Sequence, residues 1–191
     1  GAKYAVENLK ASLAGEKELL VVFGDAVKGD GLRKLVALGD SLGIPVKYIA
    51  LVDYANSRGA MDMGLLPDLG PGYHAVEGKA GLTLPQMMAA TDLDLLWVVG
   101  ANPLARHTLA SSNAFVVVQD LFLTETAVYA DVVLPASGWP EKDGTVTNTN
   151  RQVQMGRQAL PLPGDTRHDL WIIQEIANRM GCGWTYKHVS E

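Results

Sequence analysis

Five short apolar runs constrain the fold of this chain more than any other feature of its sequence. Each run is rich in Val, Ile, Leu or aromatic residues and is too short to form a helix. None alternates clearly between apolar and polar residues, which is typical of strands that are covered on both faces. The runs lie at residues 19–24, 46–52, 94–100, 114–120 and 130–136. They predict the buried strands of a parallel sheet.

Parallel strands need crossover connections, and segments with helical periodicity separate most of the runs. The sequence predicts longer helices at 3–14, 30–43 and 165–181, and shorter ones at 83–92, 103–112 and 124–130. The predicted fold class is therefore α/β, a three-layer domain of the doubly wound (Rossmann-like) type. Its mainly parallel sheet has five strands, with helices on both faces.

The domain organisation follows from length and from one irregular stretch. A chain of 191 residues is compatible with a single α/β domain over 1–191. Residues 53–82 lack helix or strand periodicity and predict a long irregular inserted loop, of a length that is usually functional or packed against another domain. Because the chain does not start with Met, we expect a fragment of a larger multidomain subunit.

Composition excludes several classes of function. The formal net charge is -5 and no Lys/Arg cluster is present, which argues against a nucleic-acid partner. No apolar run approaches the roughly 18 residues of a membrane span, so no direct membrane insertion is expected. The single cysteine, Cys182, rules out an internal disulfide and a cysteine-based metal site, and the four histidines are scattered. No nucleophile and base pair emerges, so we predict no catalytic residue and no metal ligand.

The candidate site lies where the predicted strands end, since ligands of open α/β sheets bind beyond the carboxyl ends of the strands. Gly100, Ala101 and Asn102 follow one strand in a turn that resembles an anion site, where free amides face a phosphate. Asp120 lies twenty residues after Gly100, a spacing at which dinucleotide folds present a carboxylate to a sugar. Ordinary turn roles also explain Gly100, Asn102 and Pro103, and local spacing alone favours this alternative.

Thr124 and Thr126 follow Asp120 and allow two interpretations. Their hydroxyls could face the same crevice as Asp120. Alternatively, Thr124 caps a helix, with Glu125 as a favourable charge in its first turn.

The stretch "QDLFLTETAVYADVVLPASGWPEKDGTVTNTNRQVQ" carries a further pattern. A strand ending in Asp is followed by Thr-x-Thr, by Ala-Asp-Val-Val-Leu-Pro-Ala, by a Glu-x-x-Gly-Thr turn and by Asn-x-x-Arg-x-x-Gln. This combination resembles the molybdopterin oxidoreductase superfamily. The resemblance adds Pro135, Gly144, Asn148 and Arg151 to the candidate cofactor-binding residues. It implies a domain that binds one guanine dinucleotide arm of the pterin cofactor at its strand ends.

Within that superfamily, "RGAMDMGLLPDLGPGY" and "GANPL" most resemble the large iron–sulfur subunit of NADH-quinone oxidoreductase, respiratory complex I. The catalytic subunit of NAD-linked formate dehydrogenase is the second resemblance. The first implies a scaffold domain in the electron-transferring peripheral arm, without a cofactor of its own and inactive alone. The second implies a domain that holds molybdopterin guanine dinucleotide.

Both resemblances imply iron–sulfur clusters in further N-terminal domains. The implied partners are those domains and other subunits of a respiratory complex. The implied location is a bacterial, cytoplasmic complex attached to the membrane periphery.

Overall fold

A computed structural model describes residues 2–191, without the side chains of residues 2–6 and 10; Gly1 lies outside the described part. All five predicted strands are present, and each end lies within two residues of the apolar run that predicts it. Two further strands, β6 and β7, follow β5 within residues 144–156. The strands are β1 (Leu19–Phe23), β2 (Val46–Ala50), β3 (Leu95–Val99), β4 (Phe115–Asp120), β5 (Val132–Pro135), β6 (Gly144–Thr147) and β7 (Val153–Gly156).

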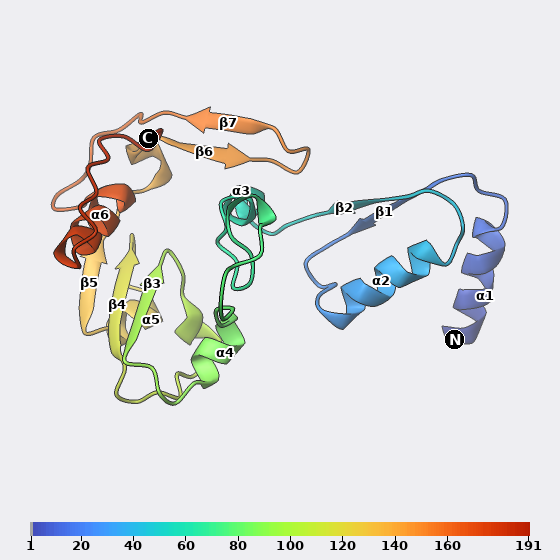
Figure 1. The fold of residues 1–191 in the computed structure, drawn as a ribbon, viewed down its shortest axis with the longest axis horizontal. Coiled ribbons are helices and arrows are strands. Elements are labelled where there is room, and N and C mark those ends of the chain that lie inside the picture. Colours follow the sequence, from blue (N-terminus) through green and yellow to red (C-terminus); the bar gives the residue numbers. More distant parts are fainter. Residues whose placement is uncertain (1) are drawn as a thin grey trace. The chain divides into compact units, whose positions relative to one another are not determined.

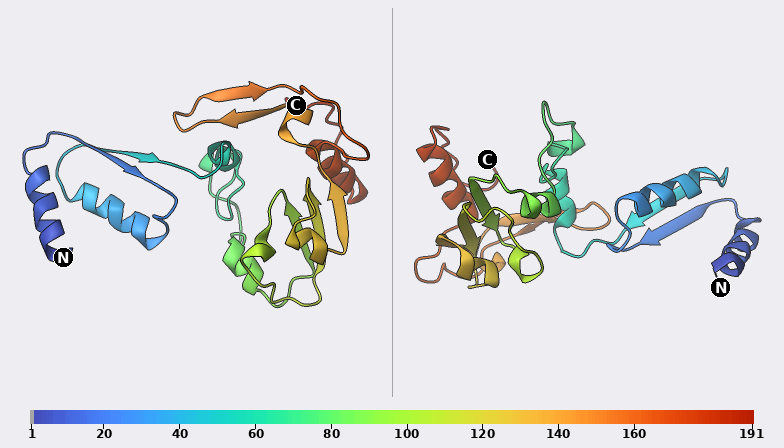
Figure 2. Two further views of the ribbon diagram at one scale, coloured as in Figure 1. Left: turned by 180° about the vertical axis from the view of Figure 1, so that it is seen from behind. Right: turned by 90° about the horizontal axis from the view of Figure 1, so that it is seen from below.

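The strands do not form the single five-stranded sheet that the sequence predicts. β1 and β2 form a parallel pair, β3, β4 and β5 form a separate parallel sheet in that order, and β6 pairs with β7. Figures 1 and 2 show β3, β4 and β5 side by side and running the same way. Apolar runs identify strands, but which strands pair depends on contacts between distant segments, and the runs do not encode that choice.

Apart from α1, which has the predicted length, the predicted helices are shorter in the structure. The α-helices are α1 (Ala2–Leu13), α2 (Asp30–Asp40), α3 (Ser57–Asp62), α4 (Leu84–Ala89), α5 (Glu125–Tyr129) and α6 (Asp169–Arg179). Three 3₁₀ turns complete the set: η1 (Pro71–Tyr73), η2 (Pro103–Ala105) and η3 (Trp139–Glu141). The predicted helix at 103–112 is only η2. Two short elements, α3 and η1, lie inside the irregular stretch 53–82.

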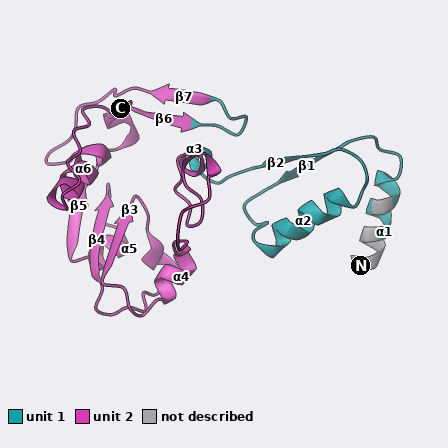
Figure 3. Cartoon of the chain, viewed as in Figure 1, with its two compact units in different colours: residues 1–58, 147–152 teal, residues 59–146, 153–191 magenta. Residues whose placement is uncertain are grey.

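The chain divides into two compact units, which are drawn in different colours in Figure 3. Unit 1 contains the residues up to Arg58 together with Thr147–Gln152, and unit 2 contains Gly59–Val146 together with Val153–Glu191. The β1–β2 pair belongs to unit 1. The β3–β4–β5 sheet and α6 belong to unit 2, which also contains most of the candidate site.

The core of unit 2 lies on one face of the β3–β4–β5 sheet. Alternate residues of β3 and β4 point into it, and Val116 and Val118 are 1% and 0% exposed. α4 contributes Met88 and α5 contributes Ala127 to the same cluster. Each large apolar side chain buried in this way stabilises the fold by about 1.5–3 kcal/mol. This packing fixes the sheet that carries the candidate site.

α6 lies beside β5, where Leu134 and Pro135 share a hollow of about 340 Å³ with Ile172 and Ile176 of the helix. The helix ends at Arg179, and Gly181 follows with a φ of 94°, a left-handed conformation that suits glycine after a helix end. Among residues 2–191, no helix has the length and apolar character needed to cross a bilayer.

Candidate functional site at the carboxyl ends of three strands

The register of the three-stranded sheet brings the predicted strand ends together. The Gly100 amide donates to the Gln119 carbonyl at 2.9 Å, so the end of β3 lies beside the end of β4. Asp120 pairs with Pro135 of β5, and the Ala136 amide donates to the Asp120 carbonyl at 3.1 Å. Gly100, Asp120 and Pro135 therefore lie in one row, which we call the carboxyl edge.

The backbone at Gly100 is not covered by other atoms of the described chain at this edge. Its φ is 59°, in the left-handed region that glycine enters without strain. No atom beyond its chain neighbours lies within 4 Å of the position that a Cβ would take. Since η2 is a single 3₁₀ turn, the loop has no long helix behind it. The Gly100 amide is bonded to Gln119, so the Ala101 amide, rather than a helix dipole, is available to an anion.

The side chains of Asn102 and Thr126 are hydrogen-bonded to each other. The Thr126 hydroxyl donates to Asn102 Oδ1 at 2.8 Å and accepts from the Leu104 amide at 3.1 Å. Asn102 Nδ2 donates to Glu125 Oε2 at 2.6 Å. This bond is the main reason why the pKa of Glu125 is lowered, and a backbone bond at Glu125 adds to it. These residues therefore fasten the turn after β3 to the start of α5.

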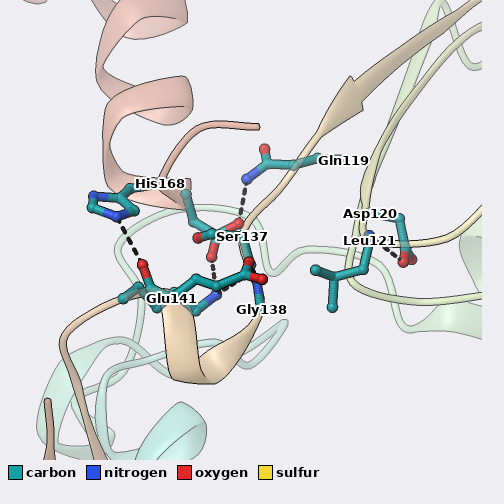
Figure 4. Close-up of polar contacts among 9 residues, drawn as sticks. Gln119, Asp120, Leu121, Ser137, Gly138, Glu141 and His168 are labelled. Carbon is teal, nitrogen blue, oxygen red and sulfur yellow. Dashed lines mark hydrogen bonds and ion pairs between the residues drawn. The ribbon is translucent and has the colours of Figure 1, made fainter. Parts of the chain in front are cut away.

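Thr124 takes the structural alternative considered above, because its hydroxyl accepts from the Ala127 amide at 3.2 Å and caps α5. Asp120 keeps one carboxylate oxygen available. Its Oδ1 accepts from the Leu121 amide at 2.6 Å (Figure 4). It also accepts from the Phe122 amide at 3.1 Å, and the two bonds hold the carboxylate in place. Within the described residues, Oδ2 accepts no hydrogen bond and can receive a donor from a ligand.

Gly144, Asn148 and Arg151 belong to the β6–β7 segment. Gly144 opens β6 in unit 2, whereas Asn148 and Arg151 form the tip between the strands in unit 1. There, the Arg151 amide donates to the Asn148 carbonyl at 3.0 Å, and Asn148 Oδ1 accepts from the Gln152 amide at 2.9 Å. Arg151 has a φ of 65°, which is uncommon for a residue other than glycine. These bonds make a local turn, and a binding role for the three residues stays a prediction.

Sequence reasoning missed a buried polar group beside the carboxyl edge. Gln119 and Ser137 are 0% and 2% exposed, and Gln119 Nε2 donates to Asp169 Oδ1 at 2.7 Å. Figure 4 shows Gln119 directed toward the Ser137 loop, while its neighbour Asp120 points elsewhere. A glutamine inside the apolar run "FVVVQD" was the available signal, because a buried amide in a strand needs partners.

A cleft of about 400 Å³ adjoins this polar group in unit 2. Its lining includes Lys142 and Asp169, which form an ion pair, and Asp143 and His188, which are hydrogen-bonded at 2.9 Å. Trp171 and Lys187 also line it. The His188 bond is the main cause of the lowered pKa of Asp143. Among the described residues, no group of three or more His, Cys, Asp or Glu side chains is placed to hold a metal ion.

The residues at the carboxyl edge fit a nucleotide-bearing cofactor. Gly100 allows a phosphate to approach the backbone, and Asp120 has an oxygen for a sugar or base donor. Gln119 Oε1 and Ser137 Oγ are buried and have no partner within the described chain. Unpaired buried polar atoms are rare in folded proteins and often mark functional positions.

The chain matches the family model for molybdopterin oxidoreductases over residues 14–179, which is most of its length. It belongs to the molybdopterin oxidoreductase family, and this membership confirms the family predicted from the sequence motifs. The family implies a molybdopterin cofactor in the parent enzymes.

Formate dehydrogenases are prominent among the curated relatives. The chain is 44% identical over 163 residues to "Putative formate dehydrogenase YrhE" of Bacillus subtilis (strain 168), covering 71% of this chain and 17% of that protein. It is 42% identical over 152 residues to the F420-dependent formate dehydrogenase subunit alpha of Methanocaldococcus jannaschii, covering 67% of this chain and 23% of that protein. The match thus spans about a fifth of the length of these relatives.

These relatives correct the order of the two resemblances. The sequence motifs favoured the complex I subunit, yet the similar proteins named above are formate dehydrogenases. Both groups share the family signature, which reflects the common fold, so short motifs within it discriminate poorly between them.

Proposed function

We propose that this chain holds one guanine dinucleotide arm of molybdopterin at its carboxyl edge, within the catalytic subunit of a formate dehydrogenase-like enzyme. One observation carries the proposal: the register of β3, β4 and β5 places Gly100 and Asp120 side by side at the strand ends. Family membership and the names of the relatives support the choice of cofactor and parent enzyme.

Each residue at the edge has a distinct task in this proposal. The Ala101 amide, next to Gly100, binds phosphate, and Asp120 Oδ2 accepts a donor from guanine or ribose. Asn102 and Thr126 hold the turn in place, and Thr124 fixes α5 behind it. Pro135 ends β5 next to Asp120. For Gly144, Asn148 and Arg151, a binding role rests on the family resemblance alone.

The chain supplies binding and orientation only. When bound, the cofactor supplies a redox-active molybdenum centre, and the remaining parts of the parent protein would complete the reaction. Iron–sulfur clusters in those parts would exchange electrons with that centre. The isolated chain is therefore expected to have no formate dehydrogenase activity.

Guanosine 5′-diphosphate is the simplest probe of the proposal, because it carries the base, sugar and diphosphate of the arm. We expect calorimetry to detect binding to the wild-type chain. Asp120→Ala should weaken it about tenfold or more, since a hydrogen bond to a charged group contributes about 1.5–3 kcal/mol.

Asp92→Ala is the matched control, because Asp92 is also an acidic residue of unit 2 but is exposed in a loop away from the strand ends. It should bind as the wild type does. If the wild-type chain gives no signal with the diphosphate, the proposal fails and a cofactor-free scaffold becomes the better account.

A further inference from the structure

A closed ring of hydrogen bonds links the carboxyl edge to α6. Gln119, one residue before Asp120, donates to Asp169 at the first position of α6. Asp169 pairs through its other oxygen with Lys142. Lys142 also donates to the Ser137 carbonyl at 3.1 Å, and Ser137 directly follows Ala136, whose amide is bonded to Asp120.

The ring joins segments that are far apart in the sequence. Gln119 and Asp169 are separated by 50 positions, and Lys142 and Asp169 by 27. The Lys142 and Asp169 side chains are 32% and 28% exposed, so water screens their attraction only in part. Cutting the ring at the ion pair removes one link between the 137–142 loop and α6; another is the bond between His168 Nε2 and the Glu141 carbonyl at 3.0 Å.

We propose that Lys142 and Asp169 are positioning residues for the ligand at the carboxyl edge, and this rests on the function proposed above. Neither side chain is proposed to contact the ligand. Their pair fixes the loop after β5 against the end of β4, which keeps the row of Gly100, Asp120 and Pro135 in a single arrangement. A site that is held in its binding geometry loses less entropy when the ligand binds.

A simpler role for Lys142 has to be separated from positioning. Any lysine near a diphosphate attracts it through space, and removing the charge alone would weaken binding. Lys187 serves as the control, because it lines the same cleft and Lys187→Met makes the same change in charge. Positioning by the ring predicts different results for the two lysines.

The test measures the dissociation constant of guanosine 5′-diphosphate for the full chain and for variants. Lys142→Met and Asp169→Asn should each raise it about tenfold, the size expected for one lost hydrogen bond to a charged group. The double variant should be no weaker than the weaker single variant, because both changes open the same ring. Lys142→Arg should restore most of the affinity, and Lys187→Met should change it less than about twofold.

Thermal unfolding of each variant separates positioning from mere stability. If Lys142→Met lowers the melting temperature but binds as Lys187→Met does, the ring is structural and the inference is wrong. If Lys142→Met does not fold, Asp169→Asn decides, since it keeps an acceptor for Gln119 and changes only the ion pair. A wild-type chain that does not bind the diphosphate overturns the proposed function, whereas a binding chain with unaffected variants overturns only the ring.

Discussion

Thr126 shows how a residue of a binding signature can act entirely inside the fold. It is fully buried, and its hydroxyl is both a donor to Asn102 and an acceptor from Leu104. From the sequence, a hydroxyl aimed at a ligand and a hydroxyl aimed at a turn look the same. The difference is decided by a partner more than twenty residues away, which local spacing does not reveal.

Thr126→Val tests this structural role. Valine keeps the shape of threonine but leaves the Leu104 amide without its acceptor, so the free energy of unfolding should fall by about 1–3 kcal/mol. Chemical denaturation measures the change. Thr108→Val is the matched control, because Thr108 is exposed, and it should have little effect. Equal losses in the two variants would contradict the role of the Thr126 hydroxyl.

At the same scale, Asp120 was found from its position after a strand, and Gln119 was missed. Strand ends are visible in a sequence because an apolar run stops, and Asp120 is the residue at which it stops. The partner of Gln119 is Asp169, which lies 50 positions further along the chain. Trp171, two residues after Asp169, also gives no indication of the bond between Gln119 and Asp169. Pairs of this kind depend on how the elements pack.

At the scale of elements, the five strands were predictable and the sheet was not. Short Val-rich runs favour extended backbone locally, which explains the agreement in strand limits. Helix lengths were overestimated where turn residues compete, as after Pro103, where only one 3₁₀ turn forms. In α6 the buried apolar residues are Ile172 and Ala177, whereas Met180, just after the helix, is 80% exposed.

His188, in the segment after α6, is hydrogen-bonded to the Asp143 carboxylate, whose ionisation depends on pH. Asp143 accepts from His188 Nε2 at 2.9 Å and from the Gln158 amide at 2.6 Å, and both bonds lower the pKa of its carboxyl, His188 most. A lowered carboxyl pKa stabilises the fold above the ordinary value of 3.8. That contribution is lost as the pH falls through the lower, folded-state pKa.

His188→Leu should raise the pKa of the Asp143 carboxyl toward 3.8, which a carbon-detected NMR titration measures. Gln158→Ala is the control, because the bond to Asp143 comes from the backbone amide, which alanine retains. The Asp143 pKa should therefore stay low in that variant. An unchanged pKa in His188→Leu would show that the hydrogen bond from His188 does not cause the shift.

At the scale of the whole molecule, the family could be recognised from the sequence, and its subdivision could not. The signature from Asp120 to Gln154 is long and combines many positions, so it identified the family correctly. The choice of complex I over formate dehydrogenase rested on two short motifs and was wrong in its order. The organisation into two units was also absent from the predictions, because it depends on how strands pair.

The central claim is that the carboxyl edge of β3, β4 and β5 binds a guanine nucleotide. The most direct measurement is a ¹H–¹⁵N NMR titration of the full chain with guanosine 5′-diphosphate. The account predicts that the largest shift changes fall on the amides of Gly100, Ala101, Asp120 and Leu121. Shift changes confined to other surfaces, or none at saturating diphosphate, would contradict it.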